Sequence, residues 1–393
     1  MPTLRSTNGT QVRFQTHVKG KVGPNTNVIV FHHGHGSSMV IWDETIAALS
    51  KLLKAFYFIV VQAPGTGISR DLPVTNGILG LVQNTIEVVD ALFSDKQSFV
   101  FVGHSMGGAV GMKLASVHPS RVSHLILVTP APSQGITADA EYHERAKAER
   151  AFARQSRECL EAYAASSLRH KPGLLSQAKG KKKYEEVLTS EIGKAEISLN
   201  ATDEHFSGLW HEMVDLRVDC SRITAQTLMI TGAADTLLSD NLKDFRRLRR
   251  VATLHVFSRV GHDVPREAPT PLAEVIADFL QHGVVSWRTL AIEDAKIAAQ
   301  EKSVASLGQL SAMYERREAG VPSQHWQYRG PVAEKAAKSK TYAPASGAQL
   351  ATSEVCAFYE RPELGVASPN WRYRGPVAEA QALAKRRKFP AKL

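Results

Sequence analysis

Cysteines and long apolar runs are scarce in this sequence, and their scarcity excludes several classes of protein. The 393 residues include three cysteines, Cys159, Cys220 and Cys356, which lie far apart without the close spacing of a metal site. A disulfide framework is therefore excluded, and a reducing compartment is favoured. The longest apolar run, Phe56 to Val61, is far shorter than the roughly twenty residues that span a bilayer. The start of the chain also lacks the apolar core of a signal peptide, so neither a membrane span nor secretion by that route is expected.

Acidic residues are also absent from the beginning of the chain. The first is Asp43, whereas basic residues occur earlier at Arg5 and Arg13. Such a composition is similar to that of an organelle transit peptide. However, apolar and polar residues alternate from Val12 to Val18, which predicts a strand that the fold requires, so a cleaved presequence is disfavoured.

The net charge of +10 is concentrated near the carboxyl end. From residue 286 onward, 17 lysines and arginines face 10 aspartates and glutamates, a surplus of seven that leaves three positive charges for the other 285 residues. The main body therefore has no electrostatic reason to bind nucleic acid or another polyanion.

Short β-branched and aromatic runs alternate with helical patterns along most of the chain. This alternation predicts a mostly parallel sheet with helices on both faces, which is the α/β fold class. The expected strands are 12–18, 27–31, 56–62, 98–102, 124–129, 227–231 and 253–257, and the expected helices are 41–53, 79–93, 109–117 and 271–280.

Residues 133–222 interrupt the alternation with charged, alanine-rich helical sequence. Connections that leave parallel strands emerge at the carboxyl edge of the sheet, so this insertion is expected to cover that edge as a helical lid. The predicted organisation is a core formed by residues 1–132 and 223–285, a lid formed by 133–222, and a helical and extended carboxyl-terminal tail formed by 286–393.

The stretch Gly103 to Gly108, with the sequence GHSMGG, lies between an apolar run and a helical pattern. A Gly-x-Ser-x-Gly turn in that context is typical of a nucleophile elbow, which exposes the serine hydroxyl above the end of a parallel sheet. The flanking glycines remove Cβ atoms that the tight backbone could not accommodate. Ser105 is therefore the predicted nucleophile.

An acid and an imidazole follow two later strands. Asp235 comes after the strand at 227–231, and His262 comes after the strand at 253–257. A serine hydroxyl needs a neutral imidazole to accept its proton, and a carboxylate on the far ring nitrogen fixes the tautomer of that imidazole. We therefore expect His262 to be the base and Asp235 the acid, with Asp240 as a lesser candidate for the acid.

Backbone amides are expected to stabilise the negative charge that develops on the attacked carbonyl. The elbow supplies the Met106 amide, and the glycine-containing loop after the strand at 27–31 supplies a second donor, which we assign to His35. Three neighbouring residues, His104, Gly34 and Gly36, are predicted to border the substrate.

The histidines at positions 32, 33 and 35 are an alternative metal site. No clustered carboxylate or cysteine completes such a site, so the sequence predicts no metal.

Four other acidic residues near these motifs are expected to have structural roles. Asp263 and Glu267 flank His262, where their charges are able to shift its pKa. Their expected role is helix capping or loop hydrogen bonding. Asp215 and Asp219, at the end of the insertion, are expected to be solvated charges.

Five stretches in this order resemble the α/β-hydrolase superfamily: HHGHGSS, APGTGISR, GHSMGGAVG, TGAAD and GHDVPREAP, spread over residues 28–282. The resemblance implies a serine-dependent hydrolase with a helical lid and no cofactor. A serine at the elbow argues against the dehalogenase and epoxide-hydrolase branches, which have aspartate there. The sequence departs from the family in lacking a proline shortly after Asp235 and in placing Ala63 where members often have aspartate.

The predicted substrate is a small or medium acyl compound or a lipid-like ester or thioester, cleaved through an acyl-enzyme on Ser105. Acyl transfer and cleavage of a carbon–carbon bond would use the same residues, so the sequence leaves these reactions open. A non-catalytic binding or scaffold protein with this fold is the alternative of a different class.

The tail contains an internal duplication, in which residues 314–334 recur as 359–379. Two copies are too few for a self-supporting repeat protein. We expect the tryptophans and tyrosines of the motif to dock on the hydrolase body or on a second subunit of a homo-oligomer, with a bivalent ligand for a partner as the alternative. The motif is nearly charge-balanced, so stacking on nucleic acid is disfavoured.

The chain ends in Ala391, Lys392 and Leu393. This tripeptide is similar to the Ser-Lys-Leu address that a peroxisomal import receptor binds. In a eukaryotic source it predicts a peroxisomal enzyme, and otherwise a cytoplasmic one is expected.

Overall fold

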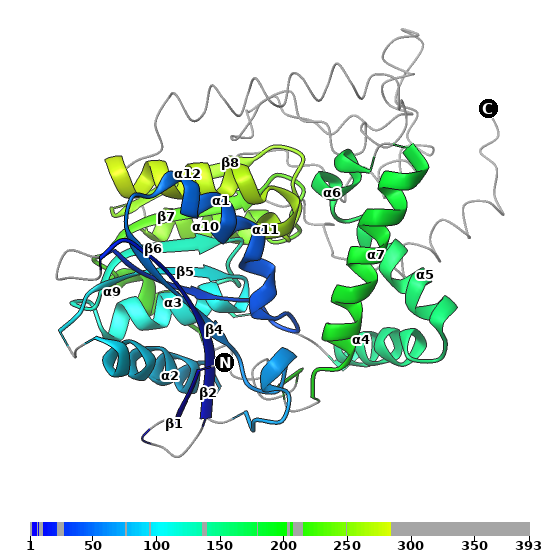
Figure 1. Cartoon of the computed structure of the whole chain (residues 1–393), viewed down its shortest axis with the longest axis horizontal. Helices are drawn as coiled ribbons and strands as arrows, with labels where there is room; N and C mark the ends of the chain where they lie inside the picture. The colour runs from blue at the N-terminus through cyan, green and yellow to red at the C-terminus, as the bar shows by residue number, and fades with distance from the viewer. Residues whose placement is uncertain are drawn as a thin grey trace, which may run out of the picture.

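A computed structural model describes residues 2–283, apart from 6, 8–10, 22–26, 75–76, 94–95, 136–139, 179, 203–204, 207–214 and 249. In this part of the chain, eight strands form one sheet in the order β1-β2-β4-β3-β5-β6-β7-β8 (Figure 1). The strands are β1 (Thr3–Arg5), β2 (Gln11–Lys19), β3 (Val28–His32), β4 (Phe56–Gln62), β5 (Phe99–His104), β6 (Val122–Val128), β7 (Gln226–Gly232) and β8 (Ala252–Phe257). β2 is antiparallel to β1 and β4, and the pairs from β4 to β8 are parallel.

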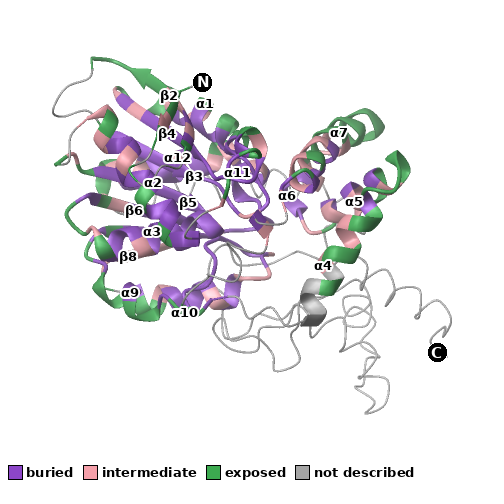
Figure 2. Ribbon diagram, turned by 90° about the horizontal axis from the view of Figure 1, so that it is seen from below, coloured by how far each residue is buried: buried purple, intermediate pink, exposed green. Residues whose placement is uncertain are grey.

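The central strands are apolar on both faces because helices cover both sides of the sheet. All residues of β3 and β5 are buried, as are the last four of β6 (Figure 2). The predicted α/β class with a mostly parallel sheet is therefore confirmed. The predicted strand at 12–18 is β2, and β1 pairs outside it at the edge of the sheet.

Two layers of helices cover the sheet. One core cluster packs β-strand side chains against α2 (Gly77–Leu92) and α3 (Met106–Val117). The opposite cluster packs them against α1 (Asp43–Leu52), α11 (Val264–Glu267) and α12 (Pro269–His282). The short 3-10 helices η1 (Met39–Trp42) and η2 (Gly67–Ser69) follow β3 and β4. No helix in the described residues is both long and apolar enough to cross a membrane.

Helices α4 to α7 come from the insertion between β6 and β7 and stand beside the sheet (Figure 1). They are α4 (Ala140–Ala153), α5 (Arg157–Leu168), α6 (Pro172–Gln177) and α7 (Gly180–Leu199). A small separate core holds them together, formed by Ala153, Leu160, Ala164, Ile192, Ala195 and Leu199. We refer to these four helices and the loops that join them to the core as the insertion.

The last predicted helical part of the insertion belongs to the core instead. α9 (Arg217–Arg222) packs on α3 and on α10 (Leu238–Leu248), which the sequence analysis did not predict. Asp219 on α9 is buried and accepts hydrogen bonds from Lys113 at 3.0 Å and Ser116 at 2.7 Å, so the expectation that it is solvated is wrong. Asp215 remains exposed and is paired with Arg217.

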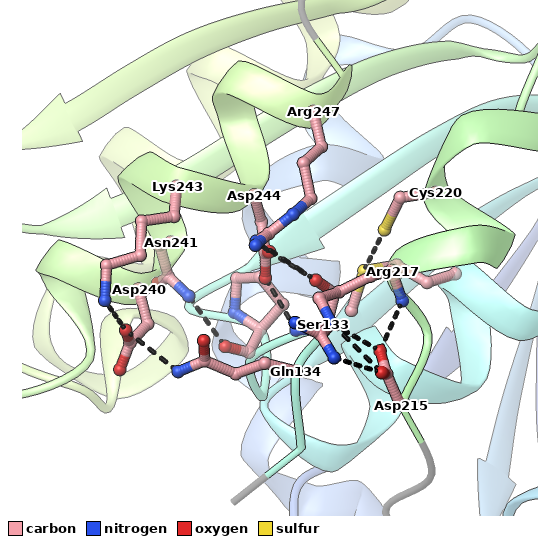
Figure 3. Close-up of polar contacts among 12 residues, drawn as sticks. Ser133, Gln134, Asp215, Arg217, Cys220, Asp240, Asn241, Lys243, Asp244 and Arg247 are labelled. Atoms are coloured by element: carbon pink, nitrogen blue, oxygen red, sulfur yellow. Dashed lines mark hydrogen bonds and ion pairs between the residues drawn. The ribbon is translucent and has the colours of Figure 1, made fainter.

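The two ends of the insertion meet over α10 (Figure 3). The Leu216 amide donates to the Ser133 carbonyl at 2.6 Å, and the Ser133 amide donates to the buried Asp244 carboxylate at 2.7 Å. One helix of the core therefore fixes both points where the insertion leaves and rejoins the sheet. The duplicated motif and the terminal tripeptide lie outside the described residues.

Candidate active site

The turn at Ser105 has the strained backbone that the elbow motif predicts. Ser105 joins β5 to α3 with φ of 52° and ψ of −115°. Two glycines make this turn possible, since a Cβ at Gly103 would lie 2.2 Å from the Gly107 carbonyl oxygen and one at Gly107 would lie 2.4 Å from the His32 carbonyl oxygen. The Ser105 amide donates to the Val128 carbonyl at 3.1 Å, which ties the turn to β6.

In the described residues, strained backbone conformations occur at the carboxyl edge of the sheet. The non-glycine residues with positive φ are Ser105, Thr129 and Arg259, which follow β5, β6 and β8. Such conformations persist only where the surrounding structure holds them, and they cluster at functional sites. The active site is therefore expected at the carboxyl edge of the sheet.

His262 and Asp235 meet at the same edge. His262 Nδ1 lies 3.1 Å from Asp235 Oδ2, and the Asp235 side chain is fully buried. The other Asp235 oxygen accepts the Leu237 amide at 3.0 Å, which fixes the carboxylate. Burial opposes protonation of His262, but the carboxylates of Asp235 and Asp263 outweigh it and raise the pKa of His262 above its ordinary value.

The structure does not bring Asp240 to His262. Asp240 lies on α10, where it binds Lys243 at 2.7 Å and Gln134 at 3.2 Å (Figure 3). The acid that contacts the imidazole is Asp235.

His104 and Thr129 connect the His262 loop to the elbow. His104 Nε2 donates to the His262 carbonyl at 2.9 Å, and Thr129 Oγ1 donates to the same oxygen at 2.9 Å. The rings of His104 and His262 lie 5.0 Å apart. Burial lowers the pKa of His104 to about 4, so its ring is neutral at neutral pH. His104 is thus a buried support of the His262 loop, and its place beside the substrate stays a prediction.

The loop after β3 lies directly against the elbow. A Cβ at Gly34 would lie 3.0 Å from Ser105 Cβ and 2.9 Å from His104 Nδ1, so only glycine lets the loop approach this closely. Met106 is buried as the first residue of α3, where amides have no acceptor within the helix. The predicted amide donors, Met106 and His35, therefore lie on the two segments that flank Ser105.

Gly36 contacts the insertion. Its amide donates to His205 Nε2 at 3.0 Å, and a Cβ there would lie 3.1 Å from the Phe206 ring. That Gly36 also borders the substrate stays a prediction. His205 Nδ1 in turn donates to the Pro64 carbonyl at 2.9 Å. Sequence reasoning missed His205, because its partners are far away along the chain.

The histidines of the β3 loop support that loop and do not form a metal site. His33 Nδ1 donates to the Gly34 carbonyl at 2.8 Å, and its Nε2 accepts the Ala63 amide at 3.0 Å. Burial lowers the pKa of His32 to about 4 and that of His35 to about 3, which keeps both rings neutral. In the described residues, no group of three or more histidines, cysteines and acids could hold a metal ion.

A second contact joins the insertion to the His262 loop through buried charges. Asp263 pairs with Lys194 and, at 2.9 Å, with Lys171, and Glu191 pairs with Lys171 and Arg266. Burial opposes the ionisation of Asp263, but the two lysines outweigh it and hold the pKa of Asp263 well below its usual range. Asp263 precedes α11 without capping it, so the capping expectation is wrong for this residue.

Glu267 fulfils the expectation of loop hydrogen bonds. Its carboxylate accepts the amides of Gly261 and Asp263 and, from the insertion, that of Gly173. Burial raises the pKa of Glu267 to about 7, against the opposing effect of these amides and of Lys171.

A cavity of about 300 Å³ lies between α7, η1 and α11. It adjoins both loops of the site, since Ser37 and Ser38 follow the β3 loop and Lys194 contacts Asp263. Its lining combines hydroxyls, two acids, two bases and apolar groups: Ser37, Ser38, Val40, Ile41, Asp43, Glu44, Ser190, Gly193, Lys194, Ile197, Pro265 and Arg266.

Comparison with known proteins agrees with this architecture. A family model described as the alpha/beta hydrolase family matches residues 29–275. The monoacylglycerol lipase ABHD6 of Homo sapiens is 27% identical over 294 residues, which cover 70% of this chain and 84% of that protein. The monoacylglycerol lipase abhd6-A of Xenopus laevis is 25% identical over 289 residues, which cover 69% of this chain and 82% of that protein.

Solved structures share the fold. An esterase from Exiguobacterium antarcticum superposes with a TM-score of 0.56 at 20% identity and covers 71% of this chain and 98% of its own. An enol-lactonase from Burkholderia xenovorans gives a TM-score of 0.53 at 21% identity and covers 72% of this chain and 100% of its own. The family match extends from β3 to β8 and includes the elbow and the His262 loop. This chain is an enzyme of the alpha/beta hydrolase family.

Proposed function

We propose that this enzyme hydrolyses a carboxylic ester through an acyl-enzyme on Ser105. The observation that carries the proposal is the Asp235 carboxylate on His262 Nδ1 at 3.1 Å, which leaves Nε2 as the ring nitrogen for proton transfer, at the same edge of the sheet as the strained elbow of Ser105. His262 takes the Ser105 proton as the hydroxyl attacks the ester carbonyl, and it returns that proton to the departing alcohol. Water, deprotonated by His262, then releases the acid and restores Ser105.

The amides of Met106 and His35 are proposed to bind the oxygen that becomes negative. Both residues lie on segments packed against Ser105. Because they are backbone groups, they are in place before the reaction and need no reorganisation as charge develops.

The proposed substrate is an ester of a small to medium or lipid-like acyl group. Two relatives are named monoacylglycerol lipases, which supports an ester with a hydroxylated alcohol part. The cavity beside the site supports such an alcohol, because its serine hydroxyls both donate and accept hydrogen bonds.

A fluorophosphonate probe tests the nucleophile. We expect a covalent adduct on Ser105 of the wild type and none on the Ser105→Ala variant, together with a loss of ester hydrolysis of about 10⁴-fold or more. A wild-type protein that neither reacts with the probe nor hydrolyses p-nitrophenyl esters of any chain length would refute the proposal. A preference for acyl-CoA over these esters would replace the ester with a thioester.

Gly193 allows a test of the cavity, since no atom lies within 4 Å of a Cβ placed there. A Gly193→Leu side chain is expected to fill the cavity and to lower kcat/KM for a glyceryl ester about fivefold or more relative to the methyl ester of the same acid. Gly193→Ala is the matched control and should keep the ratio of the wild type. An equal effect of Gly193→Leu on both esters would show that the alcohol part of the substrate does not bind in this cavity.

The predictions for the tail are retained as proposals. In a eukaryotic source, a reporter that carries the last ten residues is expected to enter peroxisomes through the import receptor, and a reporter that stays in the cytosol would contradict this.

Deletion of the residues after Leu310 is expected to lower the melting temperature or to dissociate an oligomer. An unchanged melting temperature and mass would contradict docking of the duplicated motif.

A further inference from the structure

One buried carboxylate holds the backbone on both sides of His262. Glu267 is 4% exposed. It accepts the Gly261 amide at 3.1 Å and the Asp263 amide at 3.2 Å, so the residues before and after His262 both donate to the same side chain. Both bonds end on one buried side chain, so they hold the backbone on the two sides of His262 in a fixed relation to each other.

The same carboxylate extends to the insertion. Glu267 Oε2 accepts the Gly173 amide at 2.9 Å, and the Glu267 carbonyl accepts Gln177 Nε2 at 3.1 Å. Glycines make the approach possible, since a Cβ at Gly261 would lie 2.3 Å from the His170 carbonyl oxygen and one at Gly173 would lie 2.7 Å from Glu267 Cβ. Three segments therefore meet at Glu267: the His262 loop, α11 and the loop before α6.

The remaining polar groups of His262 are held as well. Its carbonyl accepts from His104 and Thr129, both at 2.9 Å, and its ring contacts Asp235. The Asp263 carbonyl also accepts the amides of Arg266 and Glu267, and the Asp263 carboxylate pairs with Lys171 and Lys194. The bonds to the Glu267 carboxylate are the ones that hold the amides of Gly261 and Asp263, on the two sides of His262. A loss of these bonds would let the loop rotate about the carbonyl contacts and carry the ring away from Asp235.

We propose that Glu267 is a positioning residue that keeps the His262 imidazole on Asp235. The proposal rests on the proposed function for the role of His262 in the reaction. Glutamine is the informative substitution, because its single oxygen serves one group of amides while its NH₂ faces the other group as a second donor.

The test compares Glu267→Gln with Asp219→Asn. The control changes a buried carboxylate on α9 that contacts Lys113 and Ser116 and none of the candidate site residues. Selective ¹³C labelling of histidine, with His262→Ala for assignment, gives the pKa of His262 by NMR whether or not the protein hydrolyses esters. In Glu267→Gln this pKa is expected to fall by about 0.5 or more as the ring leaves the carboxylate. The kcat of Glu267→Gln for ester hydrolysis should be lower than that of the wild type by about tenfold or more, and its KM should stay within about twofold of the wild-type value.

Asp219→Asn is expected to lose stability while its His262 pKa and kcat stay as in the wild type. The proposal is overturned if Glu267→Gln leaves the His262 pKa unchanged, or if an active wild type gives a Glu267→Gln variant with the kcat of Asp219→Asn. If Glu267→Gln does not fold, Glu267→Asp is measured with the same criteria. Aspartate keeps the carboxyl group but holds it on a side chain that is one methylene shorter. An unreactive Ser105 in the wild type would instead count against the proposed function alone.

Discussion

Two of the contacts between the insertion and the core have opposite character. The neutral contact joins His205 and Phe206 to the β3 and β4 loops at His35, Gly36 and Pro64 through hydrogen bonds and ring packing. The charged contact joins α6 and α7 to the His262 loop, and its residues are Lys171, Glu191, Lys194, Asp263 and Arg266.

The difference decides where the insertion parts from the core most easily. A bond between neutral groups contributes about 0.5–1.5 kcal/mol net, so the neutral contact separates at modest cost. Separation of buried ion pairs leaves charges without partners, which costs several kcal/mol. The insertion is therefore expected to stay attached at the His262 loop and to open, when it opens, beside Gly36 and the elbow.

Removal of Asp263 should have the largest effect. Asp263→Ala leaves Lys171 and Lys194 buried without their shared carboxylate, and the free energy of unfolding is expected to fall by about 3 to 5 kcal/mol. Urea denaturation measures it. Asp215→Ala, which breaks an exposed pair with Arg217, is the control and should cost at most about 1 kcal/mol. A loss for Asp263→Ala as small as that of the control would show that the charged contact is not the stronger one.

Acid should weaken the neutral contact before the charged one. Burial lowers the pKa of His205 to about 4 and that of His35 to about 3, whereas an unfolded histidine has a pKa near 6.5. The unfolded chain thus binds more protons than the folded one below pH 6.5, so the free energy of unfolding falls as pH is lowered toward 4. Asp263 has a depressed pKa, so its contribution is lost only when pH falls through a value well below 3.8.

Denaturation between pH 6.5 and 5 measures this dependence. Glu267 and His262 have raised pKa values and oppose the fall in stability. Among the described residues, eight histidines have lowered values, and the six with the largest shifts outweigh this opposition: His32, His33, His35, His104, His170 and His205. His205→Asn removes one of the six, so its stability should vary less steeply with pH. A wild type whose stability stays constant over this range would contradict the assignment of neutral buried rings.

A smaller effect is expected from Phe206. Its ring packs edge-on to His35 at 4.8 Å and carries the Arg150 guanidinium 3.6 Å from its centroid. Phe206→Ala is expected to cost about 1 to 2 kcal/mol, the sum of a ring pair and a cation–π contact. Tyr184→Ala, an exposed aromatic on α7, is the control and should change stability little. A cost above that of Asp263→Ala would reverse the ranking of the two contacts.

The smallest effect should come from Gly193, in the middle of α7. A Cβ at this position meets no atom within 4 Å, so Gly193→Ala should stabilise the helix by about 0.5 to 1 kcal/mol without touching either contact. Thermal denaturation measures the gain. Destabilisation would show that α7 needs glycine for a reason other than space.

The sequence located the proposed reacting groups because a parallel sheet collects them. Ser105, Asp235 and His262 each follow a strand, and the carboxyl ends of parallel strands meet at one edge. α10 was missed although its apolar residues recur at helical spacing at Leu238, Leu242, Phe245 and Leu248, because its charged composition obscured the pattern.

The partners that support these groups left no local signal. Gly36 and His205 are separated by 169 positions, and Gly173 and Glu267 by 94. Asp235 and Asp240 were both candidates for the acid in the sequence, since both follow β7 closely. The turn after β7 directs Asp235 to His262, while α10 carries Asp240 to Lys243.

The sequence by itself determined the α/β class, the elbow serine and the chain order of the proposed nucleophile, acid and base, because strand periodicity and a Gly-x-Ser-x-Gly turn are local features. Only the tertiary structure decided which acid contacts the imidazole, which histidines are buried and neutral, and how Glu267 ties the His262 loop to the insertion. These depend on burial and on distances between segments far apart in the chain, and both quantities exist only after the chain has folded.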